Sequence, residues 1–182
     1  MPGLTPGYSC AMTQNAHLPR AVPALILAAS IAVLGSAFAF QYLGGYAPCK
    51  LCYWQRWPYA LAIPASLLAL ALLARDNRFW ARAVVGLCGL AFVIGGGIAV
   101  YHVGIENGWW QGPTTCSGPA FEADSIDALM AQIEQAPVIR CDQVQWSLFG
   151  ISMAGFNVLI SFGLAAFALI PALWRYIAGA RT

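Results

Sequence analysis

Six cysteines occur in this chain, and four of them form two pairs whose spacing suits thiol–disulfide chemistry. Cys49 and Cys52 are separated by two residues in the segment Ala47–Cys52, whereas Cys116 and Cys141 lie in the only long polar stretch. A C-x-x-C pair closes a short ring and switches readily between dithiol and disulfide. Two thiol pairs held together at a membrane edge can pass two electrons from a soluble donor to a carrier dissolved in lipid.

The residues around the first pair favour a thiolate. We expect a helix to begin close to Cys52, and the partial positive charge of a helix N-terminus stabilises a thiolate. Arg56 follows Cys52 by four residues and shares its helix face, so its charge adds to this effect and suits a carbonyl oxygen of a bound acceptor. The alternative is that Arg56 only anchors the helix at the lipid headgroups.

The second pair allows two further interpretations. Gly112-Pro113 and Gly118-Pro119 surround Cys116 with turn residues, which suits a reachable thiol. An isolated pair of this kind is typical of a static loop disulfide. A structural zinc site made of four cysteines normally uses two closely spaced pairs, and the wide separation of Cys116 from Cys141 argues against it. We therefore expect no metal site.

Only a few other residues in the apolar segments are candidates for chemistry. His102 precedes Glu106 by one helical turn, and it either relays protons to an acceptor bound nearby or is a packed or solvated helix-end residue. Asn157 is expected to form an interhelical hydrogen bond. Cys88 is expected to be a small buried apolar residue, and Cys10 is assigned no role.

The composition requires a membrane protein. Of 182 residues, 60% are hydrophobic and 9% are charged, and the mean hydropathy is +0.67, whereas soluble domains carry about 25% charged residues. We predict an all-α membrane protein, a four-transmembrane-helix bundle with two extracytoplasmic loops. A short amphipathic helix is expected in the second loop, where apolar residues recur at helical spacing at Ile126, Leu129, Met130 and Ile133. The expected spans are about 21–43, 53–74, 83–104 and 146–174 in a single domain of residues 20–175, between cytoplasmic tails at 1–19 (disordered) and 176–182.

The distribution of basic residues predicts the orientation. Lys and Arg favour cytoplasmic loops, and the larger group lies beside the first span, in the loop between spans two and three, and at the C-terminus. Both termini are therefore expected in the cytoplasm, and both cysteine pairs on the outer side, where disulfides persist. The alternative, a signal peptide cleaved near Ala37-Phe38-Ala39, is disfavoured by the long preceding tail. The cytoplasmic group is Arg20, Arg75, Arg78, Arg82, Arg175 and Arg181, and the outer group is Lys50, Arg56 and Arg140.

Taken together, these motifs resemble the DsbB family of bacterial inner-membrane disulfide bond formation proteins. The segment Pro48–Arg56 resembles the family's first outer loop, and Tyr101–Glu106 and Trp110–Cys116 resemble its second. Cys141 with the following Trp146, Phe149 and Gly150 resembles the start of its fourth helix, and the likeness covers about residues 21–172. The bulky Trp57-Pro58 and the additional Cys10 and Cys88 depart from the pattern.

The resemblance implies a quinone-dependent thiol oxidase that reoxidises a DsbA-like periplasmic thioredoxin-fold partner. By position, Cys116 would form the mixed disulfide with the partner, and Cys141 would be its pair mate. Cys49 and Cys52 would reoxidise that pair, with Cys52 facing ubiquinone or menaquinone and Arg56 beside the ring. His102 is added as a quinone-site residue because it is expected near the acceptor.

Two other functions compete with this one. An enzyme resembling vitamin K epoxide reductase would place its loop pair before its C-x-x-C, and here the order is reversed. A non-catalytic membrane protein with a static loop disulfide or metal-handling cysteines would show no exchange among the four thiols.

Overall fold

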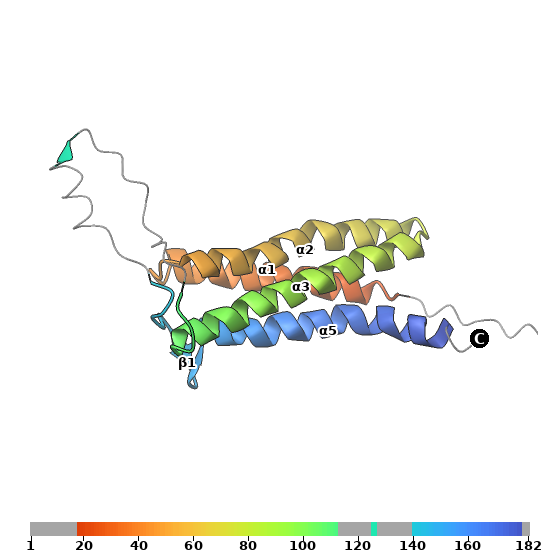
Figure 1. Cartoon of the computed structure of the whole chain (residues 1–182). Coiled ribbons are helices and arrows are strands. Elements are labelled where there is room, and N and C mark those ends of the chain that lie inside the picture. The colour runs from red at the N-terminus through yellow and green to blue at the C-terminus, as the bar shows by residue number, and fades with distance from the viewer. Residues whose placement is uncertain (1–17, 113–124, 127–139, 180–182) are drawn as a thin grey trace, which may run out of the picture.

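A computed structural model describes residues 18–112, 125–126 and 140–179 of the chain. Four long helices lie side by side in one bundle: α1 (Ala21–Tyr42), α2 (Lys50–Ala74), α3 (Arg78–Glu106) and α5 (Met153–Gly179) (Figure 1). Each contains a segment long and apolar enough to cross a bilayer. The predicted four-helix membrane fold is confirmed, although most of the amphipathic segment expected in the second loop lies outside the described residues.

Helix α2 begins at Lys50, before the expected position, because Cys49 caps it. The extended backbone of Cys49, at φ −75° and ψ 172°, lets its sulfur accept a hydrogen bond from the backbone N–H of Cys52. This satisfies one of the N–H groups that every helix start leaves without a partner. Pro58 and Pro64 both lie inside α2, beyond its first turn. The first cysteine of the C-x-x-C pair is thus also the helix cap.

Helix α5 begins at Met153, later than the apolar pattern suggests, because a hairpin precedes it. Strands β1 (Ser147–Leu148) and β2 (Ile151–Ser152) pair antiparallel, with Ser147 opposite Ser152. Both loop residues between them have positive φ, 52° at Phe149 and 78° at Gly150. This is the backbone that a two-residue hairpin loop demands. The hairpin ends the polar segment that carries Cys141.

Helix α3 packs closely against both α2 and α5, and α1 packs mainly against α2. The glycines of α3 allow the neighbouring helices to approach closely. A Cβ at Gly95 would come within 2.7 Å of Pro58 Cγ on α2, and one at Gly89 within 2.6 Å of Leu169 Cγ on α5. Gly97, in contrast, has nothing within 4 Å of its added Cβ. The close contacts bring one end of α3 against the start of α2.

Candidate functional site

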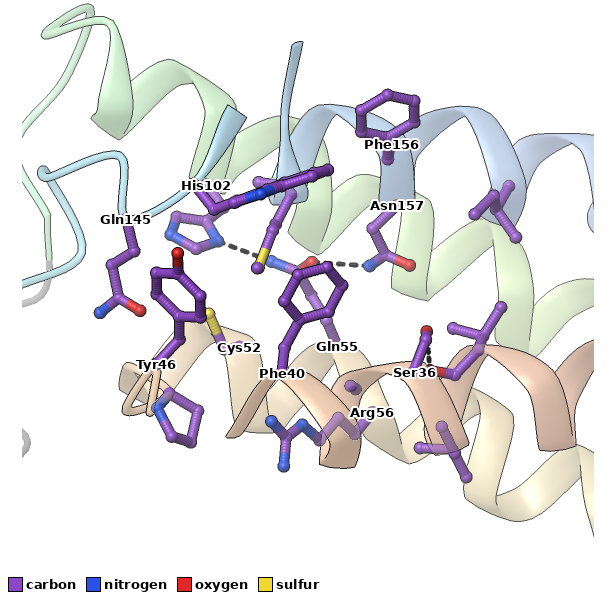
Figure 2. A pocket seen from close by; sticks show the side chains of 18 of the residues that line it. Ser36, Phe40, Tyr46, Cys52, Gln55, Arg56, His102, Gln145, Phe156 and Asn157 are labelled. Carbon is purple, nitrogen blue, oxygen red and sulfur yellow. Dashed lines mark hydrogen bonds between the residues drawn. The ribbon is translucent and has the colours of Figure 1, made fainter. Parts of the chain in front are cut away.

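A chain of polar side chains crosses the apolar interior of the bundle between α2 and α5. The hydroxyl of Tyr59 lies 2.7 Å from Ser161 Oγ and donates to Asn157 Oδ1 at 2.6 Å. Asn157 Nδ2 donates to Gln55 Oε1 at 2.6 Å, and Gln55 Nε2 lies 2.8 Å from Nδ1 of His102 on α3 (Figure 2). The interhelical hydrogen bond expected of Asn157 is confirmed, and it belongs to a network that ends on His102.

The sequence analysis missed the rest of this network, although a signal was present. Gln55 and Tyr59 are four residues apart in one span, and Asn157 and Ser161 are four residues apart in another. Polar residues at this spacing share one helix face. Two such faces in otherwise apolar spans indicate that the helices turn them toward each other, because unpaired polar groups are costly in lipid.

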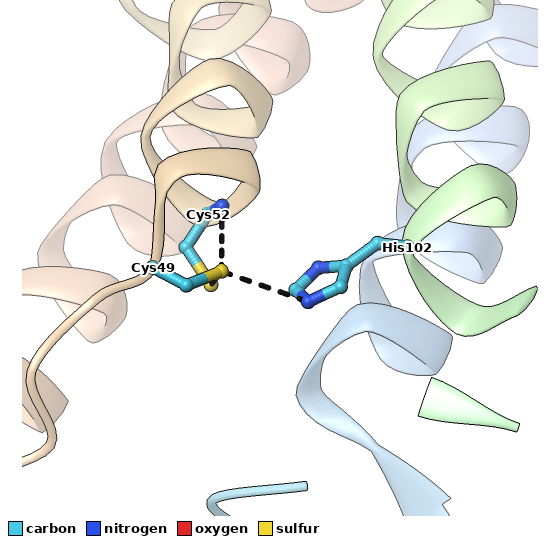
Figure 3. A group of neighbouring side chains, drawn as sticks. All are labelled: Cys49, Cys52 and His102. Atoms are coloured by element: carbon cyan, nitrogen blue, oxygen red, sulfur yellow. Dashed lines mark hydrogen bonds between the residues drawn. The ribbon is translucent and has the colours of Figure 1, made fainter. Parts of the chain in front are cut away.

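His102 is a packed residue, since only 5% of its side chain is exposed. With the amides oriented as described, Nδ1 accepts from Gln55, so the ring proton of the neutral imidazole resides on Nε2. That nitrogen faces Cys49 Sγ at 3.6 Å (Figure 3). It also lies 3.9 Å from Glu106 Oε1. Glu106 in turn accepts a hydrogen bond from Ser152 of the hairpin. The histidine therefore connects the internal chain to the first cysteine pair.

Cys49 and Cys52 lie together at the first turn of α2. Their sulfurs are 3.1 Å apart, and the Cys49 thiol donates to Cys52. Cys49 is buried, with 2% of its surface exposed, whereas Cys52 is partly exposed. The hydrogen bond to Cys52, together with burial, raises the pKa of Cys49 to about 12. In the dithiol form Cys49 therefore keeps its proton, and Cys52 is the sulfur that accepts the hydrogen bond.

Cys141 joins this group from the polar segment before the hairpin. It packs against the cluster formed by Cys49, Leu51 and Ile105. Burial, with a further contribution from Cys49, raises the pKa of Cys141 to about 11, and backbone hydrogen bonds to Leu51 and Lys50 oppose the shift. Three of the four predicted redox cysteines thus meet at one end of the bundle.

Of the other three cysteines, the structure describes only Cys88. Cys116 and Cys10 lie outside the described residues. Cys88 on α3 is buried in the hydrophobic core of the bundle, with 4% of its surface exposed, as expected of a small apolar residue.

A cavity of about 320 Å³ lies beside the thiols between α1, α2 and α5 (Figure 2). Cys52, Arg56 and His102, the three residues predicted for a quinone site, are all on its lining. Volumes of about 300–1,000 Å³, with mainly apolar walls and a few polar groups, are typical of small-molecule sites. This lining therefore fits the ring of a lipid-soluble acceptor. Its apolar wall includes Val33, Leu34, Phe40, Trp146, Phe156 and Ile160.

Arg56 is held in place by several neighbours rather than extended into solvent. Its Nη1 donates to Gln41 Oε1 at 2.7 Å. Its guanidinium also lies over the rings of Phe38 and Tyr53, at 5.2 Å and 5.1 Å from their centroids. These contacts fix a positive charge at the cavity wall, one helical turn from Cys52.

Comparison with known proteins agrees with the sequence motifs. The family model described as "Disulfide bond formation protein DsbB" matches residues 19–171. A disulfide bond formation protein B of Verminephrobacter eiseniae is 31% identical over 174 residues, which cover 90% of each chain. That of Methylococcus capsulatus is 27% identical over 148 residues, 76% of this chain and 85% of the relative. No solved structure matches the chain significantly.

Proposed function

The chain belongs to the DsbB family, the disulfide bond formation proteins, and we propose that it is a thiol oxidase that reoxidises a DsbA-like partner and passes the electrons to a membrane quinone. One observation carries this proposal: Cys52 is a member of the C-x-x-C pair and also lines an apolar cavity, together with Arg56 and His102. A thiol in that position can exchange with neighbouring sulfurs on one side and face a lipid-soluble acceptor on the other.

Electron flow begins at Cys116 in this proposal. A thiolate of the partner attacks Cys116 of a Cys116–Cys141 disulfide and displaces Cys141 as a thiolate. The partner's second thiolate then attacks the partner sulfur of the mixed disulfide. This releases the oxidised partner and leaves Cys116 and Cys141 reduced. The packing of Cys141 against Cys49 supports the next exchange, in which the Cys49–Cys52 disulfide is reduced and the Cys116–Cys141 disulfide is restored.

The residues at the cavity then prepare the Cys49–Cys52 dithiol to lose two electrons and two protons. A bound ubiquinone or menaquinone supplies an acceptor for both. Cys52 presents its sulfur at the cavity wall, and Arg56 holds a fixed positive charge one turn away. The Nε2–H of His102, 3.6 Å from Cys49 Sγ, can donate a hydrogen bond to the thiolate that forms when Cys49 releases its proton. The internal hydrogen-bond chain orients that ring.

The proposed location is the bacterial inner membrane, with both termini in the cytoplasm and the cysteines facing the periplasm. The cysteine cluster lies at one end of the bundle, and the turn between α2 and α3 lies at the other (Figure 1). Arg75 and Arg78 flank that turn, and basic residues favour the cytoplasmic side. This arrangement supports the orientation derived from the distribution of charge.

Reconstituted turnover tests the proposal. Purified protein in detergent, given a reduced DsbA-like partner, should reduce added quinone, measured by ultraviolet absorbance. Cys52→Ser should abolish quinone reduction, whereas Cys88→Ala, which changes a thiol remote from the site, should retain it. Full activity of Cys52→Ser would exclude the assignment. A partner that lacks its second active-site thiol should accumulate as a mixed disulfide with Cys116 of the oxidised parent, because it attacks the Cys116–Cys141 disulfide and has no thiolate of its own to release it. A single disulfide that stays the same with and without quinone would instead support a structural role.

A further inference from the structure

Three donor atoms converge at the start of α2 in a way that the sequence spacing did not reveal. The Sγ atoms of Cys49 and Cys52 and a ring nitrogen of His102 all lie within 4.8 Å of one another. The sequence argued against zinc because the two members of its second cysteine pair, Cys116 and Cys141, are widely separated in the chain. The structure supplies a histidine from another helix as the third ligand (Figure 3). We propose that the dithiol form of this site binds one thiophilic d¹⁰ cation of the Zn²⁺ class through Cys49, Cys52 and His102.

The distances between the donors fit tetrahedral coordination with little movement. With Zn–S of about 2.3 Å and Zn–N of about 2.0–2.1 Å, tetrahedral angles place S and N about 3.6 Å apart and two sulfurs about 3.8 Å apart. The observed separations are 3.6 Å from Cys49 Sγ to His102 Nε2 and 3.1 Å between the sulfurs. The sulfurs must therefore separate by less than 1 Å, and Cys52 Sγ already lies within 4.8 Å of the His102 nitrogen.

The charges in the site also suit a divalent cation. Two thiolates and one neutral imidazole balance two positive charges, so the buried site carries no net charge when it is occupied. Thiolate and imidazole are the ligands that zinc prefers. Cys141 packs against Cys49 and offers a further sulfur for the fourth position, although a third thiolate would give the occupied site one net negative charge. Alternatively, a water molecule can fill that position from the cavity on which Cys52 and His102 lie.

The hydrogen-bond chain is able to hold His102 in its ligand form. A ligating Nε2 needs its lone pair, so the ring proton must move to Nδ1 and be donated to an acceptor there. Turning both amides, those of Gln55 and Asn157, reverses the chain and places Gln55 Oε1 against Nδ1. The Tyr59 and Ser161 hydroxyls adapt, because either one can donate to the other. Every bond in the chain is kept, so the switch to a metal-ligating tautomer leaves no buried polar group unpaired.

Occupancy depends on the redox state of the site. A disulfide between Cys49 and Cys52 removes both thiolates, so only the dithiol binds the cation. While the cation is bound, both sulfurs are occupied and the pair is held reduced. This inference adds a ligand to the proposed oxidase and does not require it, because binding is measured without partner or quinone.

Cadmium titration of the phosphine-reduced protein tests the inference. We expect one Cd²⁺ per chain, with a sulfur-to-metal charge-transfer band that is absent after diamide has formed the disulfide. Cys52→Ser should abolish this band, and His102→Ala should weaken binding at least about tenfold. Cys88→Ala, the matched control for a thiol outside the site, should bind as the parent does. Equal binding by Cys52→Ser and the parent would overturn the proposal.

X-ray absorption of the zinc-loaded parent supplies a measurement that needs no variant to fold. A first shell with one nitrogen and two or three sulfurs supports the site. A shell without nitrogen, or one made only of oxygen, would refute it. Neither result depends on quinone reduction, so failure of the metal site and failure of the oxidase function are distinguishable.

Discussion

Replacing Asn157 with leucine tests whether the polar chain holds α5 to α2. Leucine keeps a similar volume but removes the hydrogen bonds to Gln55 and Tyr59. Interhelical hydrogen bonds in membrane proteins average about 0.6 kcal/mol and reach about 1.7 kcal/mol each, so losing two should cost about 1–3 kcal/mol. Tyr59 keeps Ser161 as a partner, whereas Gln55 Oε1 loses its bond to α5. The loss of stability therefore arises mainly at Gln55, whose amide also hydrogen-bonds to His102.

Unfolding in mixed micelles with increasing sodium dodecyl sulfate measures this loss as a lower midpoint. Ser161→Ala and Ser66→Ala form a matched pair of controls, because both serines are fully buried but only Ser161 has a hydrogen-bond partner among the described residues. Ser161→Ala should destabilise the protein by about 1 kcal/mol or less, and Ser66→Ala should be neutral or slightly stabilising. If Asn157→Leu unfolds at the same midpoint as Ser66→Ala, the chain contributes nothing and the reasoning is wrong.

Three further outcomes are expected. Arg56→Ala should raise the apparent Michaelis constant for quinone more than it lowers maximal turnover, and an unchanged constant would remove Arg56 from the acceptor site. Gly95→Ala should destabilise the bundle by about 1–3 kcal/mol, because its Cβ meets the rigid ring of Pro58 at 2.7 Å, while Gly97→Ala, with open space, should not. The pKa of Cys141, about 11 compared with the ordinary 9.0 of a cysteine, leaves it with less thiolate at pH 8 than an exposed thiol has. A thiolate of higher pKa is intrinsically more nucleophilic, which offsets part of this loss, so iodoacetamide should modify reduced Cys141 about tenfold more slowly than an exposed thiol. The difference in rate should shrink as pH rises toward 11, and equal rates at pH 8 would contradict the raised pKa.

The four spans could be predicted because lipid demands long apolar helices and leaves few alternatives. The helix starts were less predictable, since they depend on local backbone geometry. Capping by Cys49 and the positive φ values of Phe149 and Gly150 move the starts of α2 and α5, and hydropathy records neither effect.

The site was predictable in its thiols but not in its internal connections. Chain topology indicated that Cys49 and Cys141 share a membrane side, but their contact depends on how the polar segment folds over α2. The burial of His102 and its link to Gln55 depend on how far each helix is rotated about its axis. A single polar residue in an apolar span indicates that it has a hydrogen-bond partner, but only the packed bundle identifies that partner.

The helices that line the cavity differ in how extensively they pack against one another. Helices α1 and α5 both line it, yet they touch each other at few places, whereas α3 packs closely against α2 and α5. Of the helix pairs that line the cavity, α1 and α5 can therefore separate with the smallest loss of packing contacts. A long-tailed molecule arriving sideways would reach Cys52 between them without leaving its hydrocarbon surroundings. Its supply would then follow areal density and membrane fluidity rather than aqueous solubility.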